Sequence, residues 1–369
     1  MTTVDVRAED DLQVVHAATT TLTSDVPRVI GTRSFDDRAS WLSAMAGAFA
    51  MVWISYQVTG WSGRLGFTLL WFATYLALYA GLTALGNPRP VVIDRLSGAI
   101  VAGGAAIVGL ALVSTLLYTF AKGLPAYSHL NFFVQTAAGV RPTSSLNNGG
   151  ILHAIAGSTI QVGIALCFSL PLGFGTAVYM TEVGGRLAKV VRTVVEAMTA
   201  LPDVLAGLFT YVLLILVIGL SPTGFVAAVA LSVTMIPIVA RASEVALRVV
   251  PGGLREASLA LGASQWQTVR RVVFPTAKSG LATSLILGVA RIAGETAPLL
   301  IVSGASTFSN YDPFHERMNS LPLYIFAAVR SGQPNFIARG FGAAAVLLAL
   351  VMILFTFARY LARPKKGSR

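Results

Sequence analysis

The amino-acid sequence predicts an all-α integral membrane protein, a polytopic helical bundle. Three observations carry this prediction: a low content of charge, long apolar runs, and basic residues gathered in alternate connections between those runs. Only 12% of the 369 residues are charged and 55% are hydrophobic, whereas a soluble domain carries about 25% charged residues. Helices are expected because a segment in lipid must satisfy its backbone hydrogen bonds internally.

The apolar runs set the expected number of spans. A membrane-spanning helix needs about 20 predominantly apolar residues, and eight runs reach or approach this length. They are residues 41–58, 65–85, 98–120, 154–180, 203–220, 223–241, 281–302 and 340–361. Only the turn sequence GLSP separates 203–220 from 223–241, so we expect a helical hairpin there.

The connections between the spans differ in character. Residues 1–39 are polar and threonine-rich without periodicity, which predicts a disordered tail that is too long and too acidic to begin a signal peptide. Residues 182–200 form an amphipathic stretch between two spans. Residues 121–153 hold the turn-forming sequence RPTSSLNNGG. In the outer segment 303–339, the latter half of SNYDPFHERMNSLPLYIFAAV, residues 309–329, predicts a short interfacial helix. Each of these two segments is either a solvated linker or a partner contact.

The distribution of Lys and Arg predicts the orientation. Counted from a cytoplasmic amino terminus, the inner segments carry 20 of these residues and the outer segments carry six. Because basic residues are enriched in cytoplasmic connections, we expect both termini, including the basic tail 362–369, to be cytoplasmic.

The remaining composition excludes several function classes. The net charge of +11 does not indicate a nucleic-acid partner, since the basic residues are scattered between apolar runs. Cys167 is the one cysteine and lies in an apolar run, so we expect a small buried residue and no intrachain disulfide. The four histidines are not spaced as ligands, and no phosphate loop or nucleophile triad is present. We expect no catalytic site in this membrane protein, and no metal or cofactor of its own.

The segment 256–275 is polar although apolar runs surround it. Apolar residues recur at helical spacing on both sides of Gly262, which predicts two short amphipathic helices joined by a turn at this glycine. These residues are Leu254, Ala257 and Leu261 before the glycine, and Trp266, Val269 and Val273 after it. Pro275 is expected to end the second helix. From the residues alone, the segment either binds a soluble partner or lies on the membrane surface.

This segment resembles the signature of ATP-binding-cassette (ABC) importer permeases: E-A-A, three residues, Gly, nine residues, then Ile-x-Leu-Pro. The matching positions are Glu256, Ala257, Ser258, Gly262, Val272, Phe274 and Pro275. The departures are conservative, namely Ser258, Val272 and Phe274, and the spacing is complete. The resemblance implies that residues 242–280 form a cytoplasmic coupling loop that docks in a groove of an ATPase subunit.

A second polar feature lies inside the apolar run 281–302. Arg291 and Glu295 are four residues apart, on one helical face. A charged residue within a membrane span is by default a functional hypothesis, and a guanidinium suits phosphate oxygens. Arg291 is therefore a candidate anion contact that Glu295 holds in place or helps to release. The alternative is a structural ion pair. Pro298 either interrupts this helix or adds a kink.

The sequence G-E-T-A-P-L-L after this arginine resembles the PstA-type subunit of phosphate-importer permeases. The resemblance extends to VRTVVEAMTALPDVLAGLF, residues 191–209, and to LPLYIF, residues 321–326. It implies a six-span permease core at 98–361, with two additional amino-terminal transmembrane helices at 40–86. The expected location is a bacterial inner membrane.

The resemblance also implies partners and a source of energy. These are a PstC-like permease subunit, a dimer of PstB-like ATPases that uses ATP-Mg, and a PstS-like phosphate-binding protein. Two alternatives remain: a permease for another oxyanion such as sulfate or molybdate, or a secondary transporter driven by an ion gradient. We expect Asp203 in the first turn of its span. Glu182, Glu196 and Glu244 are candidates for the cytoplasmic gate, but we expect each in a solvated or interfacial position.

Overall fold

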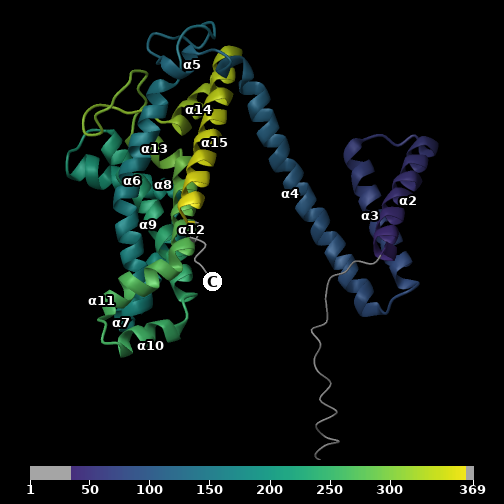
Figure 1. The fold of residues 1–369 in the computed structure, drawn as a ribbon. Helices are drawn as coiled ribbons and strands as arrows, with labels where there is room; N and C mark the ends of the chain where they lie inside the picture. Colours follow the sequence, from purple (N-terminus) through teal and green to yellow (C-terminus); the bar gives the residue numbers. More distant parts are fainter. Residues whose placement is uncertain (1–34, 363–369) are drawn as a thin grey trace, which may run out of the picture. The chain divides into compact units, whose positions relative to one another are not determined.

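The computed structural model describes residues 35–362, so the predicted tails lie largely outside the described part of the chain. Helices joined by turns make up this part, which contains no strand (Figure 1). The chain divides into two compact units, Met1–Leu112 and Val113–Arg369, which we describe separately. The predicted all-α membrane fold is confirmed.

The first unit contains the two additional helices. They are α2 (Phe35–Thr59) and α3 (Arg64–Ala84), and a turn at residues 60–63 joins them. Ala44 and Ala48 are fully buried in a cluster with Tyr75 and Tyr79. The small residues let the two helices approach closely, as is common between helices in membranes. Helix α4 (Arg89–Tyr127) follows and continues into the second unit.

The second unit is a bundle in which α9 (Gly224–Arg248) is the central helix (Figure 1). It packs against α6 (Leu152–Val178) and α12 (Phe274–Ala293), and α12 also packs against α15 (Pro334–Ala362). Polar contacts reinforce these apolar interfaces: the Ser243 hydroxyl of α9 donates a hydrogen bond of 2.9 Å to Ser284 of α12. The remaining elements are α5 (Asn131–Val134), η1 (Tyr179–Val183), α7 (Gly185–Thr199), α8 (Asp203–Thr210), η2 (Tyr211–Val217), α10 (Gly252–Ala260), α11 (Gln265–Thr268), η3 (Val269–Val273), α13 (Ala297–Val302) and α14 (Leu321–Val329).

Seven helices of the described chain are long and apolar enough to cross a membrane. An eighth crossing results if α7 together with α8 and η2 forms one broken span, since the two parts meet at 103°. The expected span at 203–220 by itself falls short, because its helical part is residues 203–217. Residues 203–217 are shorter than the roughly 20 residues that a perpendicular crossing needs, and the bend at residues 200–202 changes the helix direction.

The expected span 281–302 is also wrong in its bounds. Its helix begins earlier, because α11, η3 and α12 form one continuous helix, Gln265–Ala293. It ends earlier as well: Gly294 caps α12, and the six-residue helix α13 follows with Pro298 in its first turn. Glycine after a helix and proline at the start of one are the usual signs of such a break. The structure thus supports the first of the two interpretations of Pro298.

Pro275 does not end the second short helix. Phe274, just before it, keeps helical backbone angles, and Pro275 lies in the first turn of α12. The residue lacks an amide hydrogen, so it cannot donate to the preceding turn. The π-helical turn η3, directly before Phe274, accommodates this interruption of the α-helical ladder. A continuous helix therefore joins α11 to the membrane-spanning part of α12.

The predicted interfacial helix exists as α14, and five of its nine residues are buried. Leu321 and Ala328 are fully buried in a cluster that includes Phe132 and Ile151. The Leu321 amide donates a hydrogen bond of 2.7 Å to the Ser158 hydroxyl of α6. The sequence of α14 is apolar all round, which is typical of a helix inside a bundle and not of one at an interface. Cys167 was expected to be buried, but it is exposed on α6.

Candidate functional site

Arg291 is the centre of a charged triad near the end of α12. Its Nη1 lies 2.8 Å from Oε1 of Glu295, and its Nη2 donates a hydrogen bond to Oδ2 of Asp203. Glu295 lies in the break after α12, and Asp203 begins α8. The predicted pairing of Arg291 with Glu295 is present, and a second carboxylate, 88 residues away in sequence, joins it.

The broken helix positions this triad. Because α12 ends at Ala293, the chain turns at residues 294–296 and α13 packs against α8. A Cβ atom on Gly207 of α8 would lie 2.6 Å from the Cα of Pro298, so the close contact between these helices requires a glycine. The contact holds the start of α8, and with it Asp203, beside Arg291.

The triad borders a pocket of about 140 Å³ between α8, α9 and α12. Arg291 and Asp203 are its charged lining residues, and Thr199 and Thr234 add hydroxyl groups. The Arg291 side chain is 48% exposed, whereas that of Glu295 is 8% exposed. An anion entering this pocket can reach the guanidinium, whereas Glu295 does not line the pocket.

The charge balance of the triad limits what Arg291 can do. With both carboxylates ionised, two negative charges surround one positive charge, so the site does not hold an anion by net charge. Oε1 of Glu295 makes no hydrogen bond, so its 2.8 Å contact with Arg291 is a charge pair only. An anion must therefore compete with Asp203 for the fork of the guanidinium. This arrangement suits transient contact better than tight binding.

The coupling segment, residues 242–280, forms the end of the second unit where α7, α10 and α11 gather (Figure 1). Gly262 has φ of +84°, a conformation that only glycine adopts readily, and it joins α10 to α11 as expected. Ser264 caps α11 in a reciprocal capping box with Gln267. A hydrogen bond of 2.9 Å between the hydroxyls of Ser258 and Thr268 ties the two short helices together.

Helix α10 has no buried residue. Glu256 and Ala257 are exposed, while Val273 is fully buried at the base of the segment. Large apolar side chains are exposed as well: Leu254, Leu259, Leu261 and Trp266. Of these, Leu261 is 90% exposed at the turn. Exposed large apolar side chains in one short segment indicate a contact site for a protein or a membrane.

Arg255 fastens this exposed segment to the bundle. Its Nε and Nη2 donate to the carboxylate of Glu182 in η1, at 2.9 to 3.2 Å. The same guanidinium donates to the carbonyls of Val250 and Leu247. A two-pronged arginine–carboxylate contact fixes orientation as well as distance. We call the pair Arg255–Glu182 the clamp; it connects α10 to the end of α6.

A third charged cluster joins α7 to α9. Glu244 is 1% exposed and accepts hydrogen bonds from Arg192, Arg241 and Arg248, at 2.8, 2.8 and 2.6 Å. The expected solvated or interfacial position is therefore wrong for Glu244. It is also wrong for Glu182, which is 7% exposed, and correct for Glu196, which is 53% exposed. The hydrogen bonds and positive charges of three arginines offset the desolvation cost of burying one carboxylate.

Sequence reasoning missed Asp203, Glu182, Arg255 and Glu244 as members of these sites. Only weak signals pointed to them: Asp203 follows Pro202 at a helix start, and Glu244 has basic residues three before and four after it. The two short helices of segment 256–275 contact each other, and Arg291 contacts Glu295, as the sequence predicts. The structure does not bring those two sites into contact; α12 links them.

The clamp gives a first prediction. Changing Arg255 to Gln leaves the buried Glu182 carboxylate without its partner, and we expect about 1–3 kcal/mol lower stability of the folded chain. Thermal unfolding of the purified complex measures this loss. The change Arg270→Gln is the matched control, since Arg270 is exposed on η3. Equal effects of the two changes would contradict the clamp, as would additive effects of Arg255→Gln and Glu182→Gln in a double-mutant cycle.

The comparison with known proteins agrees with this architecture. Residues 169–366 match the family described as the binding-protein-dependent transport system inner membrane component. The chain is 39% identical over 241 residues to the phosphate transport system permease protein PstA 1 of Mycobacterium tuberculosis (strain CDC 1551 / Oshkosh), covering 65% of this chain and 79% of that protein. It is 34% identical over 263 residues to PstA of Haemophilus influenzae, covering 70% of this chain and 90% of that protein.

A solved structure shows the same fold. It is that of a bacterial alginate ABC transporter in complex with an alginate pentasaccharide-bound periplasmic protein, with a TM-score of 0.53 and 17% identity. The similarity covers 76% of this chain and 99% of that chain. Together with the family match over residues 169–366, these similarities confirm the resemblance seen in the sequence. The chain belongs to the family of inner membrane components of binding-protein-dependent transport systems, and within it to the PstA-type permeases.

Proposed function

We propose that this chain is one of two unlike permease subunits of an ATP-driven importer of inorganic phosphate. The observation that carries the proposal is the similarity to PstA permeases over most of their length, 79% and 90% in two relatives. The pocket at Arg291 is consistent with it, because a guanidinium offers two parallel donors that match the oxygens of phosphate. The chain itself performs no covalent reaction in this proposal.

The proposed partners follow from the same family. They are a PstC-like second permease subunit, a PstB-like ATPase dimer that uses ATP-Mg, and a PstS-like phosphate-binding protein. The exposed apolar residues of α10 and α11 support an ATPase contact, since they need a partner surface. In this assignment Glu256, Ala257 and Ser258 lie at the contact, and Gly262 shapes the turn between the helices. Val272, Phe274 and Pro275 join the contact to α12.

The proposed orientation places the coupling segment and both termini in the cytoplasm. The excess of basic residues in these connections supports it. In that orientation the break at residues 294–296 lies deeper along the pathway than the clamp. Phosphate would enter from the binding protein on the outer side and pass the Arg291 pocket between the two permease subunits.

The structure suggests how a movement of the ATPase reaches Arg291. The first route is the continuous helix Gln265–Ala293, which transmits a shift of α11 along its axis without a hinge. The second route is the clamp, which carries a shift of α10 to α6 through Glu182. A movement of α12 against α8 separates Arg291 from Asp203. The guanidinium then turns from the carboxylate to the anion, and it returns when the helices close again.

Uptake by reconstituted vesicles tests the proposed function. Vesicles that contain all four kinds of subunit, with ATP inside the compartment that faces the ATPase, should accumulate labelled phosphate. Excess sulfate or molybdate should leave this uptake unchanged. Competition by sulfate with no competition by unlabelled phosphate would identify another oxyanion as the cargo. Transport by this chain alone, without the ATPase, would identify a secondary transporter and refute the proposal.

A further inference from the structure

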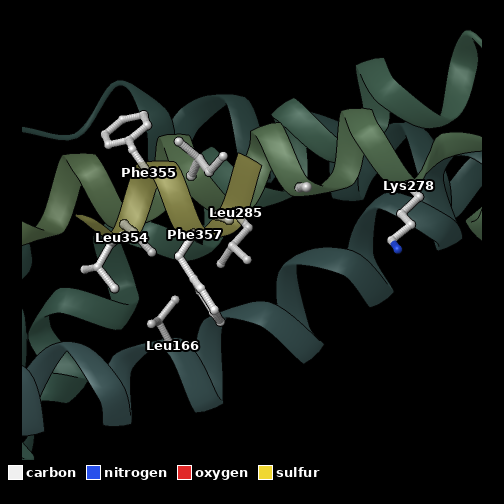
Figure 2. Close-up of a pocket in the computed structure, with 10 residues that line it drawn as sticks. Leu166, Lys278, Leu285, Leu354, Phe355 and Phe357 are labelled. Atoms are coloured by element: carbon white, nitrogen blue, oxygen red, sulfur yellow. The ribbon is translucent and has the colours of Figure 1, made fainter. Parts of the chain in front are cut away.

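A second pocket, of about 210 Å³, lies between α6, α12 and α15, away from the Arg291 pocket (Figure 2). Nine of its ten lining residues are apolar, and they include Leu166, Leu285, Leu354 and Phe357. The tenth is Lys278, whose side chain stands at one end of the lining in Figure 2. The pocket is thus an apolar groove with a single cation at its end.

This groove occupies the face of α12 opposite to Arg291. Lys278, Ala282, Leu285 and Val289 follow one another at spacings of four, three and four residues, which places them on one stripe of the helix. Arg291 is two residues beyond Val289, a rotation of about 200°. One face of α12 therefore carries the proposed pathway, and the opposite face carries the groove. A face turned away from the pathway is available to lipid.

The positive charge of Lys278 favours a ligand that carries a negative group at this end of the groove. Its side chain is exposed, and among the described residues it has neither an ion pair nor a hydrogen bond. It lies about 10 Å along the helix from Arg271, and the flexible stem of a lysine can extend its charged end from apolar surroundings toward a headgroup. Arg359, next to the lining residue Ala358 on α15, is a further exposed cation.

We propose that this groove binds an anionic phospholipid, with one acyl chain between Leu166, Leu285 and Phe357 and the headgroup phosphate on Lys278. The apolar lining matches an acyl chain, and the cation at the end of the lining is complementary to the negative charge of a headgroup phosphate. Basic pockets between membrane helices on the cytoplasmic side bind such headgroups. The assignment to the cytoplasmic leaflet rests on the proposed orientation; the binding itself does not.

Retention of phosphatidylglycerol by the purified importer complex tests this proposal. The complex is saturated with deuterated phosphatidylglycerol, washed with detergent, and the bound lipid is counted by native mass spectrometry. The change Lys278→Gln should lower the retained phosphatidylglycerol about fivefold, as expected for one basic residue at a membrane surface. Ala282→Phe keeps the charge but fills the groove, and should lower retention to a similar degree. Retention of zwitterionic phosphatidylcholine should not depend on Lys278.

The control is Lys189→Gln, which removes an exposed lysine of α7 that does not line the groove. It should leave retention unchanged. Equal losses in Lys278→Gln and Lys189→Gln would show general attraction to a basic surface and would overturn the proposal. So would unchanged retention in both groove variants. If Ala282→Phe fails to assemble with its partner subunits, Ala358→Leu on α15 fills the groove from its other wall. No substrate is present, so failure here leaves the proposed transport function untouched.

Discussion

Replacing Arg291 with Gln is expected to lower phosphate uptake by the reconstituted importer at least about tenfold. The reason is the loss of a charge-assisted contact to the anion, worth about 1.5–3 kcal/mol. Uptake is measured at several phosphate concentrations, with the amount of assembled complex determined for each variant. Arg291→Lys keeps the charge but loses the planar fork, so we expect an intermediate uptake.

The carboxylates separate a transport role of Arg291 from a structural one. If Arg291 contacts phosphate, Asp203→Asn frees the guanidinium from its competitor, and phosphate uptake should persist or saturate at a lower concentration. If the triad only locks α8 to α12, Asp203→Asn and Arg291→Gln should each reduce uptake and complex stability together. Normal uptake by a stably assembled Arg291→Gln complex would exclude Arg291 as the anion contact.

Reversing the charge of Glu256 is expected to abolish transport by breaking the contact with the ATPase. Glu256 is exposed on α10 beside the small residues Ala257 and Ser258, where a partner surface can approach closely. Mispairing a charge in a closed contact costs about 2–5 kcal/mol. We therefore expect the ATPase to bind at least about thirtyfold more weakly, which corresponds to the lower end of that range. Binding of the purified ATPase to the permease pair in nanodiscs measures this change directly.

Two further variants define what the Glu256 result means. Glu256→Gln retains the shape and removes the charge, so its defect should be smaller than that of Glu256→Lys. Lys189→Glu also reverses an exposed charge, but it lies on α7 outside the α10–α11 surface, and it should bind the ATPase normally. Undiminished ATPase binding and uptake in Glu256→Lys would refute the docking role of α10.

The charged cluster at Glu244 and the clamp at Glu182 have a common consequence for the mechanism. Both carboxylates are buried near the coupling segment and both are held by arginines, at 2.6 to 3.2 Å. They tie α7 to α9, and α10 to η1. The end of the bundle that faces the proposed ATPase is thus cross-linked by charge, whereas the exposed face of α10 is left free for the partner. A docked partner would then move this end as one body.

The sequence by itself determined the features that depend on local pattern. Apolar runs predict where helices cross lipid, because each run must satisfy its own backbone. The turn at Gly262 follows from the change of helical register around a glycine. The φ of +84° at Gly262 confirms that the turn uses a conformation that glycine adopts readily. The approach of Glu295 to Arg291 follows from a separation of four residues along a helix, although Glu295 lies just beyond the end of that helix.

Only the tertiary structure decided which distant residues meet and where helices continue. Asp203 reaches Arg291 across 88 residues, and Glu182 reaches Arg255 across 73. Periodicity within a single segment carries no information on such pairs, because they depend on how α8 packs on α13 and how α10 folds back on η1. Pro275 is the clearest case: its chemistry signals a helix end, yet η3 accommodates it within one helix. The sequence around such a proline is compatible with a helix that ends or with one that continues, and the packing of the bundle determines which of the two forms.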